Sequence, residues 1–190
     1  SFFRKAVSWF DKRLVLRGKM GAELTTLDGE EQGNVISVRG NLRPQDLIIE
    51  DLTITGGRAS DPDSVGAGIY LNQYSSPTIQ RCRLVDNRSR AGGGLAMYVY
   101  CEPVVRDCWI AHNAGGGIVD ELGRGRAGST HALVVNTVIV YNNGFGVFVL
   151  KGARLEMRNC TVANNVGDGV RGDLQAVVFV NNCIVARNSG

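Results

Sequence analysis

The sequence predicts an all-β fold, a single-stranded parallel β-helix with about 22–30 residues in each coil, and three observations lead to it. The first is a repeat whose anchor residues lie 30, 26, 29, 23 and 23 positions apart, at Leu52, Cys82, Cys108, Thr137, Cys160 and Cys183. The second is a matching position five residues after each anchor, occupied by Gly57, Asn87, Asn113, Asn142, Asn165 and Asn188. The third is the content of each repeat. A repeat of about 23 residues is too short for a pair of helices, and its short β-branched runs broken by Asn and Gly favour strands.

One domain covers residues 1–190 in this prediction, with two regions that differ in regularity. Residues 1–46 are expected to hold an N-terminal cap and irregular first coils, and residues 47–190 the regular coils. Aromatic side chains near the start suit a lid over the open end of a repeat array, because such an array needs capping; they are Phe2, Phe3, Trp9 and Phe10.

The anchor residues are expected to point into the core. When the repeats are aligned with one another and their coils stack, residues at the same repeat position form a column in space. Four anchors are cysteines, and we expect them to be buried and reduced, stacked as Cys82 with Cys108 and Cys160 with Cys183. Neighbouring rungs place Cβ atoms nearer about 5 Å than the roughly 3.8 Å that a disulfide requires.

The Asn column is expected at a bend, where each side-chain amide bonds to the amide of the next coil. Asn tolerates a left-handed φ, which a bend of this kind uses. A Gly-x-Gly-apolar signature then leads into another strand, as in Gly144–Val147 and Gly167–Val170. The longest insertion into the array is expected as a loop over residues 120–131.

The last coil is expected to be incomplete, because the sequence ends at Gly190 where every earlier coil continues into another strand. Exposed strand edges favour pairing with another chain, and uncapped arrays dissolve poorly. We therefore expect either a further segment beyond Gly190 or another copy of the chain packed on this end.

These repeats resemble the right-handed parallel β-helix superfamily, the pectate-lyase-like or "carbohydrate-binding and sugar hydrolysis" repeat proteins. The opening stretches Arg13–Gly18, Thr26–Gly29 and Leu52–Gly57 also resemble coils of that superfamily, so the resemblance covers about residues 13–190. It implies a right-handed helix and a secreted or cell-surface bacterial protein whose partner is a polysaccharide or another glycan. Such a solenoid hosts lyases, hydrolases, epimerases, adhesins and spacers alike, so the resemblance leaves the activity open.

Composition argues against several other partners. The net charge is +3, too small and too scattered for nucleic acid. No stretch of 18 apolar residues exists, so no membrane span is expected. Neither a Cys-x-x-Cys motif nor a His pair indicates a metal site, and we expect no cofactor.

Calcium is the alternative cofactor, because the lyases that the chain resembles bind calcium through outward carboxylates. The outward columns here contain no three carboxylates on adjacent rungs. Asp51, Arg81 and Asp107 alternate in sign, which favours a ladder of ion pairs on a solvated face over a calcium site.

A line of polar residues just before the Asn column gives the candidates for catalysis. Asp86, His112 and Tyr141 on successive rungs are candidates for base, proton shuttle and acid in β-elimination or epimerisation of uronic acids. The same side chains are equally compatible with a solvent-facing bend, so the catalytic residues stay undetermined.

Outward aromatic residues are the candidates for glycan binding, because exposed rings on a rigid face can stack on sugar rings. They are Tyr70, Tyr98, Tyr100, Trp109 and Phe148. The alternative is that neighbouring loops cover them.

From these features we expect a non-catalytic β-solenoid module that binds glycan or spaces other modules. One alternative is a polysaccharide lyase or epimerase acting on a uronate-containing polymer. Another is a self-associating structural module.

Overall fold

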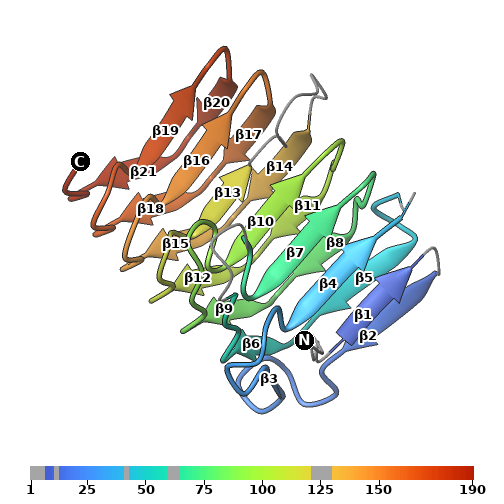
Figure 1. Cartoon of the computed structure of the whole chain (residues 1–190). Coiled ribbons are helices and arrows are strands. Elements are labelled where there is room, and N and C mark those ends of the chain that lie inside the picture. Colours follow the sequence, from blue (N-terminus) through green and yellow to red (C-terminus); the bar gives the residue numbers. More distant parts are fainter. Residues whose placement is uncertain (1–6, 11–12, 41–42, 60–64, 121–129) are drawn as a thin grey trace.

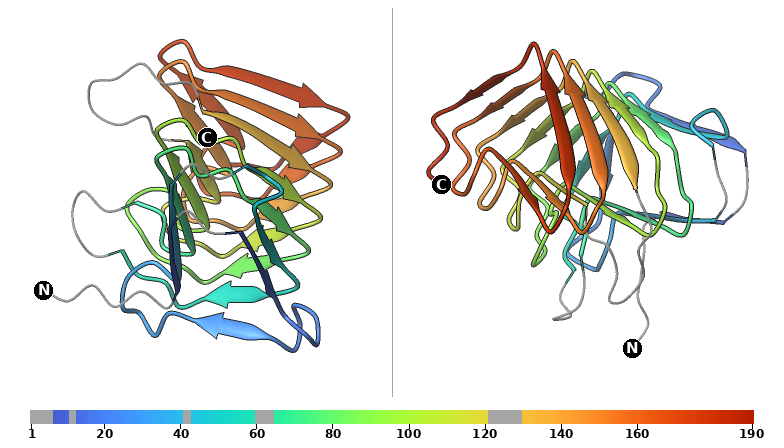
Figure 2. Two further views of the ribbon diagram at one scale, coloured as in Figure 1. Left: turned by 90° about the vertical axis from the view of Figure 1, so that its right-hand side faces the viewer. Right: turned by 90° about the horizontal axis from the view of Figure 1, so that it is seen from above.

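The computed structural model describes residues 7–10, 13–40, 43–59, 65–120 and 130–190. Every helix or strand found there is a β-strand, and the strands form three parallel sheets of seven strands each. Consecutive coils stack along one axis. In Figure 1 one sheet, called sheet A, lies in front, and a second, called sheet B, lies behind it; their strands are given below. Figure 2 shows the same stack from two further sides. The parallel β-solenoid predicted from the repeat is therefore confirmed.

Each sheet takes one strand from every coil. Sheet A contains β1 (Val7–Phe10), β4 (Ile36–Arg39), β7 (Ile69–Asn72), β10 (Leu95–Tyr98), β13 (Ile118–Asp120), β16 (Val147–Leu150) and β19 (Val170–Asp173). Sheet B contains β2 (Leu14–Arg17), β5 (Leu47–Glu50), β8 (Thr78–Gln80), β11 (Val104–Arg106), β14 (His131–Val135), β17 (Arg154–Arg158) and β20 (Val177–Asn181). Sheet C contains β3 (Thr26–Asp28), β6 (Thr53–Thr55), β9 (Arg83–Val85), β12 (Trp109–Ala111), β15 (Val138–Val140), β18 (Thr161–Ala163) and β21 (Ile184–Ala186).

The register of the strands agrees with the repeat. Ile110 lies between Leu84 and Ile139, and each of the three follows its anchor residue by two positions. These side chains are fully buried, as are inward residues of the other two sheets such as Leu71 and Val134. Columns of the alignment are thus columns of the core, and apolar burial along them stabilises the stack.

The anchor cysteines lie in the core as free thiols. Cys82, Cys108 and Cys160 are buried, and all five cysteines of the chain are unbonded, which confirms the reduced column. Cys183 differs from the prediction because it is only half-buried. It lies in the last described coil, near Val180 and Val185 in the sequence.

The Asn column forms a continuous ladder. Asn113 Nδ2 donates to Asn142 Oδ1 at 3.0 Å, and Asn142 Nδ2 donates to Asn165 Oδ1 at 2.9 Å. Each of these oxygens also accepts the backbone N–H of the preceding ladder residue, as in Asn113 N–H to Asn142 Oδ1 at 3.0 Å. The ladder satisfies polar groups that the core would otherwise leave unpaired.

The left-handed residue of this bend is not the ladder Asn, contrary to the prediction. It is the residue before it, as at His112 (φ 59°), Tyr141 (φ 56°) and Asn164 (φ 56°). The ladder Asn is selected by the hydrogen bonds of its buried amide, and the bend itself tolerates His or Tyr.

Strand pairing is already present within residues 1–46, the region predicted to hold the cap and the irregular first coils. β2 and β3 join sheets B and C, and β1 pairs with β4 in sheet A. Of the predicted aromatic lid, Phe2 and Phe3 lie outside the described residues, and Trp9 and Phe10 belong to β1. In the last described coil Val180 and Val185 are 44% and 47% exposed. No helix suited to crossing a membrane occurs in the described part of the chain.

Candidate functional site

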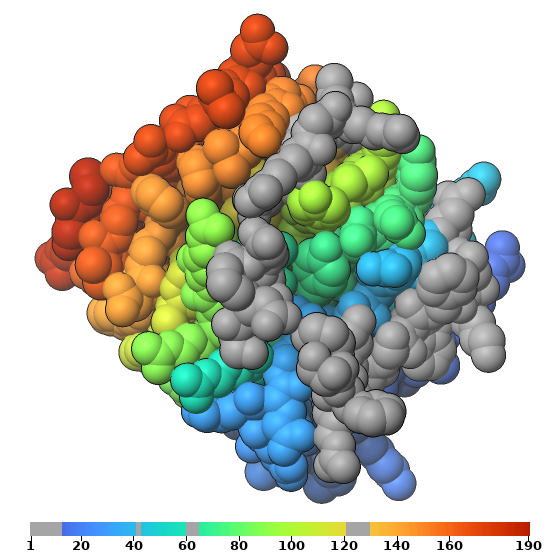
Figure 3. Space-filling view, viewed as in Figure 1, coloured from blue at the N-terminus to red at the C-terminus, as the bar shows by residue number. Residues whose placement is uncertain are grey.

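Aromatic side chains gather on the outer face of sheet A and on the turns that follow it. Tyr70 on β7 and Tyr98 on β10 project outward, because they alternate with the buried Leu71 and Met97. Both are half-buried. Figure 3 views this face, with β7 and β10 in green near the centre.

A pair of tyrosines extends this group onto the turns between sheets A and B. Tyr74 follows β7, Tyr100 follows β10, and the two rings stack with centroids 4.9 Å apart and planes 1° from parallel. Tyr74 N–H donates to Val99 O at 3.1 Å, so the backbones of the two turns are joined. Half of Tyr74 (51%) reaches solvent although one ring face is covered.

The turns that carry this pair are held in left-handed conformations. Val99 and Tyr100 both have φ of 56°, and Tyr74 has φ of 62°. Such a φ is costly for a β-branched residue, so the contacts around the turn must maintain it.

A buried polar group adjoins the aromatic residues. Asn72 on β7 is in register with Tyr98 on one side and the exposed Arg39 on the other. Its side chain is 7% exposed, and its Oδ1 has no hydrogen-bond partner within the described residues. We call Tyr70, Asn72, Tyr74, Tyr98 and Tyr100 the tyrosine site. It combines ring surface with a neighbouring polar side chain, the two kinds of group that line sugar-binding sites.

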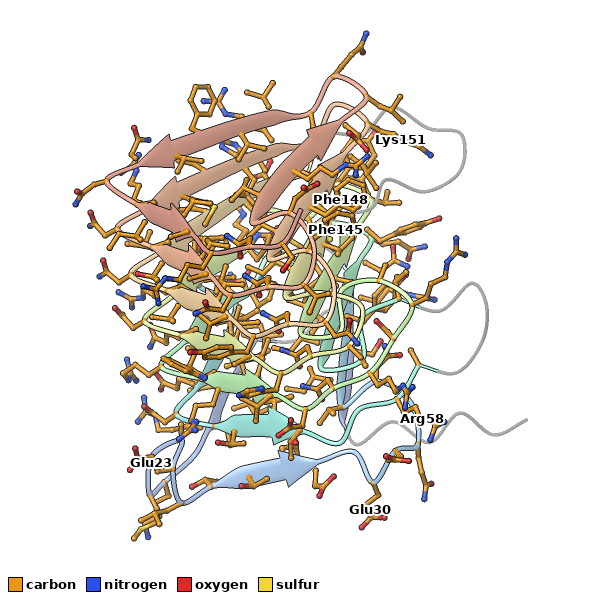
Figure 4. All side chains as sticks on the ribbon, turned by 90° about the vertical axis from the view of Figure 1, so that its left-hand side faces the viewer. Glu23, Glu30, Arg58, Phe145, Phe148 and Lys151 are labelled. Atoms are coloured by element: carbon orange, nitrogen blue, oxygen red, sulfur yellow. The ribbon has the colours of Figure 1, made fainter. Side chains whose placement is uncertain are left out.

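Phe148 lies apart from the tyrosine site. In the outward column of sheet A, Ala96 and Val119 separate it from Tyr70, and both are buried. Its ring packs against Phe145 with centroids 4.7 Å apart, side by side in Figure 4. The Arg171 guanidinium covers both rings at 5.4 and 5.5 Å from their centroids. Phe148 therefore belongs to an intramolecular cluster.

Trp109 lies on a different face. It projects from β12 in sheet C and is 39% exposed, with Arg83 and Val138 as its neighbours in register. The structure thus brings together three of the five predicted glycan-binding residues, Tyr70, Tyr98 and Tyr100, and separates Trp109 and Phe148 from them.

The predicted catalytic row exists as a row of bend residues between sheets C and A. Asp86, His112 and Tyr141 occupy the same left-handed position in successive coils, and all three are exposed. The rings of His112 and Tyr141 stack with centroids 5.5 Å apart. The arrangement places titratable groups next to one another on an exposed bend.

The outer face of sheet B carries a network around Glu50. This carboxylate is 2% exposed and accepts hydrogen bonds from Arg17, Gln80 and Arg81. Burial opposes ionisation of Glu50, but these hydrogen bonds together outweigh it and lower the Glu50 pKa. The oxygens that a cation would need are therefore already held by arginine and glutamine.

The predicted ion-pair ladder is present only in part. Arg81 binds Asp51 through two hydrogen bonds of 2.8 Å, whereas Asp107 accepts from Asn136 at 3.2 Å. No three His, Cys, Asp or Glu side chains converge within the described residues.

Sequence reasoning missed Tyr74, Asn72 and the buried Asp120. Tyr74 and Asn72 precede Tyr100 and Tyr98 by 26 residues, the spacing between Cys82 and Cys108, so the repeat contained their signal. Asp120 was assigned to the insertion at residues 120–131. It instead ends β13, and His131 begins β14.

Comparison with known proteins supplies the family. A family model described as "Right handed beta helix region" matches residues 29–125 and 121–190. Neither a curated protein nor a solved structure matches the chain. The family match covers more than half of the sequence and agrees with the three parallel sheets. The chain belongs to the right-handed β-helix family.

Proposed function

We propose that the chain is a non-catalytic module that binds a glycan at the tyrosine site. The observation that carries the proposal is the Tyr74–Tyr100 stack, which fixes two aromatic rings on neighbouring rungs with half of Tyr74 still in solvent. Rings that are fixed before binding lose little side-chain entropy when a ligand arrives. Asn72, in register with Tyr98, adds a polar side chain next to the rings. We also propose that the module is secreted or surface-exposed, where polymeric glycans are met.

Binding to a panel of soluble polysaccharides tests this function. The panel consists of hydroxyethyl cellulose, xyloglucan, galactomannan and polygalacturonate, measured by affinity electrophoresis with and without calcium. Tyr74→Ala and Tyr100→Ala should each weaken binding by about threefold to tenfold, the contribution of one stacked ring. Tyr100→Phe, which keeps the ring, should bind more tightly than Tyr100→Ala.

Matched controls separate this site from other exposed rings. Phe179 is 41% exposed on sheet B, so Phe179→Ala should leave binding unchanged. Melting temperatures of all variants show whether a loss reflects unfolding. Loss of binding in Trp109→Ala with full binding in Tyr74→Ala would move the site to sheet C and refute the proposal.

A second candidate function is β-elimination or epimerisation of a uronate polymer. The stack of His112 and Tyr141 next to Asp86 favours it, because adjacent groups of this kind can transfer protons. Incubation with polygalacturonate tests it through the ultraviolet absorbance of an unsaturated product, and through proton exchange at C5 for an epimerase. Either signal, lost in His112→Ala, would replace the binding module with an enzyme.

A further inference from the structure

Asp120 is an ionisable residue in the apolar interior of the solenoid. At the end of β13 it points inward, in register with Met97 of β10 and Val149 of β16. Its side chain has no exposed surface. Oδ2 accepts a hydrogen bond from the Thr130 hydroxyl, and no group in the described ranges bonds Oδ1. A buried carboxyl with a single partner is costly to ionise, so its presence in a core of Ile, Leu and Val calls for an explanation.

Thr130 connects Asp120 to the turn that carries Tyr100. It directly precedes β14, whose first residue, His131, donates its N–H to Cys101 O at 3.0 Å. The buried Cys101 thiol in turn lies 3.3 Å from Tyr98 O. Thr130, whose hydroxyl bonds to Asp120, therefore directly precedes His131, whose N–H bonds to Cys101 at the end of the turn.

That turn needs support from its neighbours. Val99 and Tyr100 are both left-handed, and the ring of Tyr74 packs on that of Tyr100. Loosening the Thr130–His131 backbone removes the contact at Cys101 and leaves the strained turn with fewer restraints.

We propose that Asp120 is a positioning residue of the tyrosine site, and that the site responds to pH through it. With a neutral carboxyl, Asp120 holds Thr130 and keeps the turn at Tyr98–Cys101 closed. With an ionised carboxyl, the Thr130–His131 backbone moves away from Cys101 and water reaches Asp120. The Tyr74–Tyr100 stack then loosens, and ligand binding weakens. The effect on binding rests on the function proposed for that site, whereas the effect on the turn does not.

The direction of the pH dependence follows from the environment of Asp120. Burial raises its pKa to about 7, against a smaller opposite effect of the Thr130 hydrogen bond. Opening returns the carboxyl to an ordinary pKa near the reference value of 3.8. The closed turn is therefore most stable below about pH 4, loses stability as the pH rises toward 7, and changes no further above that.

The groups that face Asp120 do not reverse this dependence. Met97 and Val149 carry no titratable group, and the Thr130 hydroxyl stays neutral. Among the described residues, Cys101 is a titratable neighbour, and burial raises its pKa to about 12, so it stays a neutral thiol throughout this range.

Hydrogen exchange of the ligand-free protein gives the first test. Between pH 4.5 and 7, protection of the amides that donate to carbonyls of this turn, those of Gln73, Tyr74 and His131, should fall by up to about tenfold per pH unit after correction for intrinsic rates, and then level off. Asp120→Asn keeps the size and an acceptor for Thr130 but does not ionise, so its profile should be flat. Protection in β15 should not change in step. An equal fall in Asp120→Asn, or in β15, would overturn the proposal.

Binding gives the second test, with the polysaccharide of the panel that binds most tightly. Its dissociation constant should increase from pH 4.5 to 7 in the natural chain and stay constant in Asp120→Asn. Thr130→Val removes a hydrogen bond that lowers the Asp120 pKa, so the fall in binding should extend to higher pH. Binding without any pH dependence would refute the role of Asp120. If no polysaccharide binds, the proposed function fails and the exchange profiles alone decide on Asp120.

Discussion

Asn142 Oδ1 accepts two hydrogen bonds from Asn113, one from its backbone N–H and one from its Nδ2, both at 3.0 Å. Asn142 Nδ2 donates in turn to Ile110 O at 3.1 Å in that same coil and to Asn165 Oδ1 at 2.9 Å in the next one. Both residues are fully buried, so no water replaces a lost partner. One side chain therefore joins three consecutive coils.

Asn142→Ala should lower the free energy of unfolding by about 1–3 kcal/mol, because it leaves buried donors and an acceptor unpaired. Chemical denaturation measures the difference. The neighbouring Asn143 is exposed, and Asn143→Ala should change stability by less than about 0.5 kcal/mol. Equal stability of the two variants would mean that the ladder does not stabilise the stack.

Gly117→Ala should destabilise the chain by about 1–3 kcal/mol, because a Cβ there would lie 2.7 Å from Gly146 O and 2.7 Å from Ile139 Cγ2. Gly172 is the matched control, since its Cβ would meet nothing nearer than 3.5 Å. Thermal melting of the two variants checks this. A lower melting temperature for Gly172→Ala than for Gly117→Ala would contradict the packing argument.

Glu50→Gln should lower stability at pH 7 by about 2 kcal/mol, because it weakens charge-assisted hydrogen bonds from Arg17 and Arg81. The lowered Glu50 pKa stabilises the fold above about pH 4.5, and this contribution is lost as the pH falls through the folded pKa. Denaturation at pH 7 and pH 3 should therefore show a smaller acid loss in Glu50→Gln than in the natural chain. Glu31→Gln, which alters an exposed pair with Arg58, should behave like the natural chain at both pH values.

The thiols should react unequally with a thiol reagent at pH 8. Cys183 is half-buried and should react in the folded protein, whereas Cys82 and Cys108 should react only after unfolding. Burial raises the pKa of Cys82 to about 11 and that of Cys108 further, so little thiolate forms at either site. Rapid labelling of Cys108 in the native protein, located by mass spectrometry, would show that the column opens.

Much of the fold could be predicted because one physical rule repeats in every coil. Inward apolar residues such as Ile110 and Ile139 and the amides of Asn113 and Asn142 recur at a set offset from each anchor, so the sequence records their columns directly. The start of regular pairing was harder to place. The early strands β2 and β3 belong to the sheets without Cys anchors or ladder Asn residues to mark them.

The candidate site was only partly predictable, because its members follow different rules. Tyr70 and Tyr98 alternate with core residues on strands, which the pattern shows. Tyr74 lies on a turn, where the alternation of a strand does not apply, and its signal in the sequence is the 26-residue spacing from Tyr100, whose ring it contacts. The inward direction of Asp120 was hidden because the insertion that follows it interrupts the repeat, and a charged residue next to an insertion favours a solvent-exposed loop.

The equal register of the last coils has a consequence for the length of the molecule. Thr137, Cys160 and Cys183 are 23 residues apart, and the strands after them pair residue for residue. Joining Asn136 directly to Cys160 would therefore place Thr161 beside Trp109, Asn165 beside Asn113 and Val170 beside Ile118, each in a column of its own kind. The molecule would be shorter by one strand spacing, about 4.8 Å, with its core, ladder and sheets still continuous. Length in this chain can thus change by whole coils, independently of the tyrosine site.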